Sequence, residues 1–527
     1  MLDFVISGGR IVDGTGRPAY QGAVGIAGDT IVTLGAETPE ARETIDAAGR
    51  VVAPGFVDIH THSDYTLLLN RDAESSVLQG VTTELMGNCG MSCAPLRDPD
   101  HLPQIVLEYM PGADGRWRGF GEWLGALESH GLSINVASLV GHGAVRMAVL
   151  GLESRAAVPE ETEAMTRLVE ESIEAGAWGL SSGLEYVPGK NAQHEELVAL
   201  CRAVHRKGGF YATHIRNRDY EYAAAIEEAI ETAGAADVPL QISHIAPRWG
   251  ARPGAAEAAF RAVDRARARG VDVAFDNHPY TRGRGLVVAA LPPWALEGGT
   301  HRLRERLRDP AQRAAMRDYP QPQWKHVRER RWELLVVYDA PANRHLQGRT
   351  IAEIAEERGC DPWDVVCALI LDQGDNPNAL FWSAPIHDQE DVDESFRRPE
   401  GMIMSDGSAV APRGPYRDTR HIYAYGWASH VLRVYVRERG LLTLEEAVHK
   451  MTGRPADRIG LRDRGVLAPG RKADIVIFDP DTVADRATFE SPIAFPSGID
   501  TVLVNGRPTV RGGSHTGARA GRVLRRM

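Results

Sequence analysis

The sequence has few cysteines, no long apolar run and no excess of positive charge. Five cysteines among 527 residues are too few, and odd in number, for a disulfide-stabilised fold, which indicates a reducing compartment. No run approaches the about 18 consecutive apolar residues of a membrane span. The first ten residues also lack the apolar segment of a secretion signal. We therefore expect a cytoplasmic protein that does not insert into a membrane.

The charge balance also excludes a class of partner. Lys and Arg number 60 against 71 Asp and Glu, so the net charge of −11 provides no basic surface for a nucleic acid. The hydrophobic content of 43% is enough for a large buried core. Length alone does not fix the number of domains, because a single barrel with insertions can exceed about 400 residues.

Short strand-like segments at both ends of the chain flank a long middle region. Residues 1–53 and 465–527 contain such segments between Gly-rich turns, which predicts one small β-sandwich domain built from both termini. In residues 54–464, buried strand-like runs alternate with amphipathic helices, which predicts an α/β fold, a (β/α)₈ TIM-like barrel. The eight runs are residues 55–59, 82–86, 134–139, 177–181, 210–213, 240–243, 273–276 and 402–405.

One segment does not fit the alternation. Residues 286–349, after the seventh strand run, are too rich in Arg, Pro and Trp for a single crossover. We interpret them as an inserted subdomain and expect it to cover the barrel mouth, where it would exclude water from the reacting centre.

Potential metal ligands stand at the ends of several strand runs. His60 and His62 end the first run, and residues two apart on a strand point to the same face. His214, His244 and Asp406 close three further runs. Because the carboxyl ends of barrel strands meet at the active-site mouth, these side chains are expected to converge there and to bind a metal.

A cysteine follows the second strand run. Cys89 lies between Gly87 and Gly90, and glycines let the backbone approach a ligand or metal closely. A thiolate binds zinc tightly. The same cysteine also permits a metal-free interpretation, in which Cys89 is the nucleophile of a Cys/His hydrolase with His214 or His244 as its base. A third interpretation is a non-catalytic barrel, which predicts that a ligand or Asp406 is missing, and none is.

Taken together, the motifs resemble a known family. The chain is similar to the amidohydrolase superfamily, and within it to the N-acyl-D-amino-acid deacylases (D-aminoacylases), over essentially its whole length. The GNCG cysteine marks this branch, because many other amidohydrolases carry a carboxylated lysine on the fourth strand, where this chain has GLSSG. The motifs in chain order are PGFVDIHTH, GNCGMSCAPL, GLSSGLEYVPG, ATHIRN, QISHI, FDNHPY, SDG and KADIVIFDP.

The resemblance implies a zinc-dependent hydrolase of a C–N amide bond in a small-molecule substrate. It implies a tight zinc site made by Cys89, His214 and His244, and a second, weaker site that would use His60, His62 and Asp406. Asp406 would also be the general base that takes a proton from water and gives it to the leaving nitrogen. Tyr186 and Tyr280 resemble substrate contacts, and His142 is a further residue expected at the mouth, with its role left open. Formation of a homo-oligomer is likewise left open.

Two departures from the family concern recognition of the substrate α-carboxylate. The family usually has a lysine where this chain has Ala246, and an arginine where it has Tyr423. We therefore expect Arg248 or Arg282 to supply the missing positive charge, with Tyr423 lining the same region. The alternative is an amide without the α-carboxylate, such as a peptide, a cyclic amide or a modified natural product.

Overall fold

Eight parallel strands in the middle of the chain form a barrel. The computed structural model describes residues 1–526 apart from 99, 101, 111, 113 and 114. Parallel pairing runs from β6 through to β17, and a parallel bridge between Thr61 and Gly407 closes the ring. The predicted TIM-type barrel is confirmed. Its strands are β6 (Phe56–Asp58), β7 (Val81–Met86), β8 (Asn135–Ser138) continued by β9 (Val140–Gly141), β10 (Gly179–Gly183), β11 (Phe210–His214), β12 (Leu240–Ile242), β13 (Val273–Asn277) and β17 (Gly401–Ile403).

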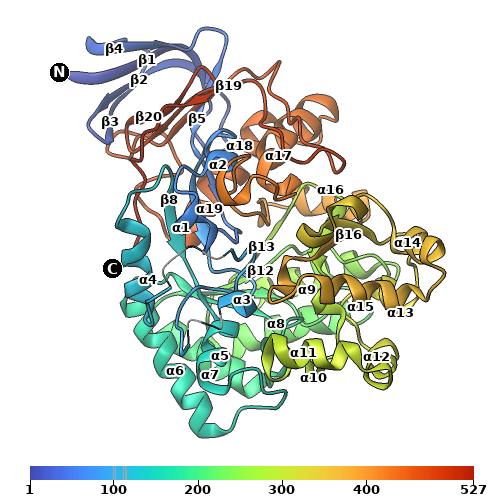
Figure 1. The fold of residues 1–527 in the computed structure, drawn as a ribbon. Helices are drawn as coiled ribbons and strands as arrows, with labels where there is room; N and C mark the ends of the chain where they lie inside the picture. Colours follow the sequence, from blue (N-terminus) through green and yellow to red (C-terminus); the bar gives the residue numbers. More distant parts are fainter. Residues whose placement is uncertain (99, 101, 111, 113–114, 527) are drawn as a thin grey trace.

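Amphipathic helices cover the outside of the barrel (Figure 1). In α6 the buried residues Met165, Val169 and Ile173 are four apart, so they share the face that packs inward. Pro159 at its first position, followed by two glutamates, favours the start of that helix. The helices between and after the strands are α4 (Phe120–Glu128), α5 (His142–Leu150), α6 (Pro159–Glu174), α7 (His194–Arg206), α8 (Tyr222–Ala236), α9 (Ala255–Ala268), α16 (Gln389–Arg397), α17 (Ile422–His430), α18 (Leu444–Met451) and α19 (Gly453–Ile459).

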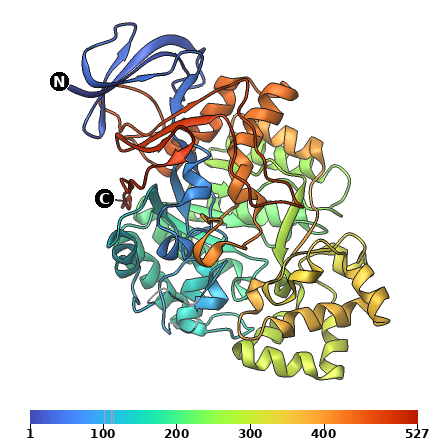
Figure 2. The same cartoon turned by 45° about the horizontal axis from the view of Figure 1, so that its top comes forward.

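Strands from both chain termini form one nine-stranded sheet. β18 pairs antiparallel with β5, which joins the two ends of the chain, and Figure 2 shows the blue and red strands side by side. The sheet has its own buried cluster, which includes Ile6, Val24 and Ile475. The description of this unit as a β-sandwich stays a prediction. The strands are β1 (Leu2–Ile11), β2 (Tyr20–Ala27), β3 (Thr30–Gly35), β4 (Ala41–Asp46), β5 (Val51–Pro54), β18 (Ile475–Phe478), β19 (Ile499–Val504), β20 (Arg507–Arg511) and β21 (Ser514–His515).

The segment between β13 and β17 packs around a second core. This core extends from Leu286 to Ile386 and includes Trp324 and Trp382, so the layer continues past the predicted boundary at residue 349. The reason is that α14 and α15 have the amphipathic pattern of crossover helices but bury their apolar faces in this core. Figure 1 shows the layer beside the barrel, in yellow-green to gold. It consists of β14 (Arg282–Leu286), α10 (Pro293–Leu296), α11 (Gly299–Arg308), α12 (Pro310–Arg317), α13 (Lys325–Arg328), β15 (Val336–Asp339), α14 (Ile351–Arg358), α15 (Pro362–Asp372) and β16 (Phe381–Pro385).

None of the helices in the described part of the chain combines the length and the apolar character that crossing a bilayer requires.

Candidate metal centre

The ends of five barrel strands, β6, β7, β11, β12 and β17, bring the predicted ligands together. Sγ of Cys89 lies 3.3 Å from Nε2 of His60, 3.5 Å from Nε2 of His244 and 3.7 Å from Nδ1 of His214. One ligand atom each from His60, Cys89, His244 and Asp406 lies within 4.8 Å of the others. The cysteine therefore lies between the two predicted ligand sets and contacts members of both.

The second predicted set meets at one carboxylate. Oδ1 of Asp406 lies 3.4 Å from Nε2 of His60 and 3.3 Å from Nε2 of His62. The Asp406 side chain is 23% exposed, whereas those of His60 and His62 are 0% and 5% exposed. Asp406 is thus the member of this set that an incoming molecule can reach most easily.

The backbone at three of these residues is unusual. Cys89, His244 and Asp406 have φ values of 51°, 39° and 57°, in the left-handed region that residues other than glycine rarely adopt. Each lies two or three residues past the end of its strand, β7, β12 or β17. Such conformations cost about 1–3 kcal/mol and cluster at functional sites.

Glycines allow the Cys89 turn to pack against neighbouring strands. A Cβ atom on Gly87 would lie 2.0 Å from the carbonyl oxygen of Leu139, and one on Gly183 would lie 2.0 Å from that of Cys89. Neither position can therefore hold a larger residue without moving the backbone. This close packing fixes where the thiol lies.

A buried carboxylate orients His214. Nε2 of His214 lies 2.7 Å from Oε2 of Glu185. Because an ionised carboxylate only accepts hydrogen bonds, Nε2 carries the proton and the lone pair of Nδ1 faces Cys89. Glu185 also accepts from Arg248, whose Nη2 lies 2.5 Å away, and from Nε2 of Gln323 at 3.1 Å. Gln323 belongs to the inserted layer, which therefore contacts the network behind this ligand.

Asp276 supports the opposite side of the cluster. Its carboxylate accepts hydrogen bonds from Nε2 of Gln241 at 2.8 Å and from the backbone N–H of His244 at 2.7 Å. Oδ1 also lies 3.4 Å from Nδ1 of His60. One buried carboxylate thus links the ring of His60 to the backbone of His244.

The electrostatics favour anionic ligands at the centre. Burial by itself raises the pKa of the Cys89 thiol, but the charge of His60 and the close contacts of the sulfur with the His214 and His60 rings hold that pKa well below its ordinary value. For Asp406, burial is likewise outweighed by the hydrogen bond from His62 and the charges of His60 and His62, which hold the pKa of the carboxyl well below its usual range.

The donor set fits zinc. Zinc takes cysteine sulfur, histidine nitrogen and carboxylate oxygen, usually in groups of four. Here the Nε2 atoms of His60 and His244 lie 3.3 Å and 3.5 Å from Sγ of Cys89. The lowered pKa of the thiol favours its ionised form. The converging group contains His60 in place of the His214 of the predicted Cys/His/His set and includes Asp406 as an oxygen donor. The division of the ligands between two zinc sites stays a prediction.

Comparison with known proteins identifies the family. The model of the Amidohydrolase family matches residues 43–510. The chain belongs to the amidohydrolase family. The resemblance predicted from the motifs is therefore confirmed.

Characterised relatives of this amidohydrolase span its full length. It is 36% identical to the D-aminoacylase of Alcaligenes xylosoxydans xylosoxydans, over 100% of this chain and 98% of that protein. A crystal structure of D-aminoacylase has a TM-score of 0.84 to it at 34% identity, with 100% of both chains covered. The N-acyl-D-glutamate deacylase of Bordetella bronchiseptica, solved with zinc and a phosphonate inhibitor, has a TM-score of 0.82 at 32% identity, again over 100% of both chains.

Two of the predicted substrate-binding residues, Tyr280 and Tyr423, lie in one aromatic group, and a third, Arg282, is hydrogen-bonded to it. The ring of Tyr423 stacks on Tyr280 at 5.1 Å and on His278 at 4.9 Å between centroids, and its hydroxyl donates to the carbonyl oxygen of Arg282 at 2.9 Å. Arg282 is half-buried and directs Nε to Oγ of Ser383 at 3.0 Å. Contact of these residues with substrate stays a prediction.

The other predicted substrate-binding residues have different surroundings. The Tyr186 ring packs against His214 at 4.7 Å, next to the ligand cluster. Arg248 points its guanidinium at Glu185, behind His214. His142 is fully buried, with Nε2 held 2.7 Å from Oε1 of Glu196. Tyr186 is thus the best placed of the three to meet a substrate.

Some residues around the centre were not identified from the sequence. Glu185 directly precedes Tyr186 in the sequence. Only a general rule could have pointed to it: a metal-bound histidine usually donates the N–H of its second ring nitrogen to an acid. Gln323 comes from the inserted layer, His387 from the segment between β16 and α16, and Arg218 from the loop after β11. No local pattern marks these last three, because their neighbours come from distant parts of the chain.

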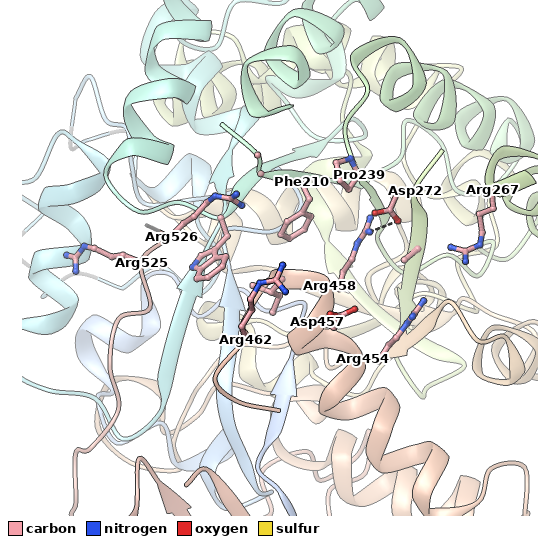
Figure 3. A pocket seen from close by; sticks show the side chains of 16 residues that line it. Phe210, Pro239, Arg267, Asp272, Arg454, Asp457, Arg458, Arg462, Arg525 and Arg526 are labelled. Atoms are coloured by element: carbon pink, nitrogen blue, oxygen red, sulfur yellow. Dashed lines mark hydrogen bonds and ion pairs between the residues drawn. The ribbon is translucent and has the colours of Figure 1, made fainter. Parts of the chain in front are cut away.

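A large cavity at the other end of the barrel is separate from this centre (Figure 3). It measures about 680 Å³ and is lined by Phe210, Pro239 and Asp272, which lie where β11, β12 and β13 begin. The candidate ligands lie where strands end. The cavity therefore belongs to the opposite face of the barrel.

Proposed function

We propose that this amidohydrolase is a zinc-dependent deacylase that hydrolyses the amide bond of an N-acyl-D-amino acid or a closely similar compound. The observation that carries the proposal is the convergence of Cys89, His60, His244 and Asp406 within 4.8 Å. The D-aminoacylase and N-acyl-D-glutamate deacylase relatives, which match the full chain, support the choice of bond.

Cys89, His214 and His244 would hold one zinc ion, and His60, His62 and Asp406 a second, weaker one. Zinc, when bound, supplies a Lewis acid that polarises the amide carbonyl and lowers the pKa of a water molecule toward about 7. Glu185 orients the His214 ring, and Asp276 holds the backbone of His244 and lies beside the His60 ring.

Asp406 is the residue that would move the proton. Its carboxylate is ionised and partly exposed, so Oδ2 can take a proton from the attacking water. The water oxygen bonds to the carbonyl carbon, the C–N bond breaks, and Asp406 returns the proton to the leaving nitrogen. The products are a carboxylic acid and a free amine.

The test is zinc-dependent release of amine. The purified protein is assayed on N-acetyl-D- and N-acetyl-L-amino acids, on a dipeptide and on a cyclic amide, before and after chelation and zinc return. We expect activity on the D-amino-acid derivatives that is lost on chelation and restored by zinc. Full activity after exhaustive chelation would instead support the Cys/His hydrolase, and no activity with zinc bound would support a non-catalytic barrel.

A further inference from the structure

The loop after β11 carries a buried arginine beside the candidate metal centre. Arg218 is 6% exposed. Its Nη2 donates to the carbonyl oxygen of His244 at 2.9 Å and to that of Ala246 at 3.3 Å. One edge of the guanidinium is therefore fixed to the backbone that carries a predicted ligand.

This arginine differs from the other buried arginines. Among the described residues four arginines are buried, namely Arg146, Arg218, Arg248 and Arg464. Three of them pair with a carboxylate: Arg146 with Glu196 and Arg248 with Glu185, each at 2.5 Å, and Arg464 with Asp474.

No described Asp or Glu oxygen lies within 4.0 Å of the Arg218 guanidinium, and its Nε is buried without a hydrogen-bond partner. A buried charge without a counter-charge is costly, so an anion is missing from its surroundings.

The neighbouring histidine does not supply that anion. Nδ1 of His387 lies 2.7 Å from the carbonyl oxygen of Pro247, so Nδ1 carries a proton. Nε2, 3.4 Å from Nη2 of Arg218, is then a neutral acceptor. Burial, followed by the charges of His278 and Arg218, holds the pKa of His387 well below its ordinary value, in agreement with a neutral ring. His387 thus positions the guanidinium but leaves its charge unbalanced.

The metal centre does not balance Arg218 either. Cys89 as a thiolate and Asp406 as a carboxylate carry two negative charges, and one zinc ion carries two positive charges. Glu185 is already paired with Arg248. The remaining carboxylate, Asp276, faces His60 and Gln241 and does not pair with the Arg218 guanidinium. With the centre loaded, the Arg218 guanidinium still has no adjacent counter-charge, and its hydrogen bond to the His244 carbonyl keeps it next to a candidate ligand. A substrate anion can bind it there through charged hydrogen bonds.

We propose that Arg218 binds the α-carboxylate of the substrate, which makes this enzyme specific for N-acyl amino acids over neutral amides. The inference rests on the proposed deacylase function. Its guanidinium lies against the backbone of Ala246, so the preceding loop supplies the positive charge that the side chain at residue 246 does not provide. Arg218 is then a specificity-determining residue, and the neutral amides considered above are poor substrates.

The test compares an acid with its neutral counterpart. Acetate release is measured on N-acetyl-D-leucine and N-acetyl-D-leucinamide, with zinc-loaded wild type, Arg218→Met and Arg218→Lys. For Arg218→Met we expect kcat/KM on the acid to fall by about 10- to 100-fold, mainly through KM, since a charged hydrogen bond is lost. Activity on the amide should stay within about threefold, which is below the effect of one such bond. Arg218→Lys should recover part of the loss on the acid.

Two controls separate recognition from folding. Arg261→Met removes an exposed arginine on α9 and should change neither substrate's kinetics. Arg282→Met removes the other arginine considered for the carboxylate, and a selective loss there instead of at Arg218 would overturn the proposal. Zinc content and circular dichroism verify that each variant is loaded and folded.

The remaining outcomes distinguish this proposal from the deacylase function. Equal losses on acid and amide in Arg218→Met, or a wild type without preference for the acid, would overturn the role of Arg218 and leave zinc-dependent deacylation intact. If wild type releases acetate from neither compound, the function fails. Calorimetric binding of N-acetyl-D-leucine to wild type and Arg218→Met then decides the role of Arg218, and equal affinities would refute it.

Discussion

Replacing Glu185 by Gln removes the charge that holds two buried partners in place. The carboxylate is 4% exposed, lies 2.7 Å from Nε2 of His214 and 2.5 Å from Nη2 of Arg248. Although burial raises its pKa, the charge of Arg248 and the hydrogen bond from His214 hold the pKa below the usual range, so the group is ionised. The neutral amide of Gln can accept the hydrogen bond from His214 but cannot balance the positive charge of Arg248. The next carboxylate, that of Asp219, lies 3.6 Å from the Arg248 guanidinium.

Two magnitudes follow from this geometry. Loss of the acid behind a metal-bound histidine typically lowers metal affinity about 10- to 100-fold, which corresponds to about 1.4–2.8 kcal/mol. Removing one partner of a buried ion pair costs about 3–5 kcal/mol of folding stability. We therefore expect weaker zinc binding together with a marked loss of stability in Glu185→Gln.

Competition with a chromophoric chelator measures the zinc Kd, and chemical denaturation of the zinc-loaded protein measures stability. Glu196→Gln is a matched control, because Glu196 is equally buried and pairs with His142 at 2.7 Å and Arg146 at 2.5 Å. It should lose similar stability and keep the wild-type zinc Kd.

An unchanged zinc Kd in folded Glu185→Gln would refute the claim that this carboxylate orients His214. Equal weakening of zinc binding in both variants would show that lost stability, and not the hydrogen bond to His214, controls affinity.

Three further predictions use other residues. Asp406→Asn should keep its fold and at least one zinc but lose about 10²- to 10⁴-fold in kcat, and steady-state kinetics within about threefold of wild type would assign the proton to another group. Cys89→Ala should lose the tightly held zinc and the activity, as metal analysis after dialysis will show, and retention of stoichiometric zinc would contradict the ligand assignment. Asp485 pairs with His430 and Arg433. Burial raises the pKa of the Asp485 carboxyl, but the two partners outweigh it and lower the pKa from 3.8 to about 2. The depressed pKa stabilises the fold fully above pH 3.8 and progressively less as pH falls toward 2, so Asp485→Asn should cost about 2 kcal/mol near neutral pH. Denaturation curves across pH check this, and a difference from wild type that grows as the solution becomes more acidic would contradict it.

The sequence alone determined the barrel and indicated which candidate metal ligands meet at one end of it. Strand runs of apolar residues between amphipathic helices have few other ways to bury both faces of each strand. The spacing of His60 and His62, and the positions of His214, His244 and Asp406 at run ends, then place these side chains at one mouth. These inferences depend only on the spacing of residues along each strand and on the rule that parallel barrel strands end at the same face.

The tertiary structure alone decided which charges neutralise one another. Arg248 looked like a substrate contact in the sequence, yet it pairs with Glu185, which lies 63 positions earlier in the chain. Arg218 carried no signal, and among the buried arginines of the described residues it is the one that pairs with no described carboxylate. The extent of the inserted layer was also hidden, since α14 and α15 resemble crossover helices until their packing partners are known. Ion pairing and core membership depend on distances between loops from different strands, and no local period encodes those distances.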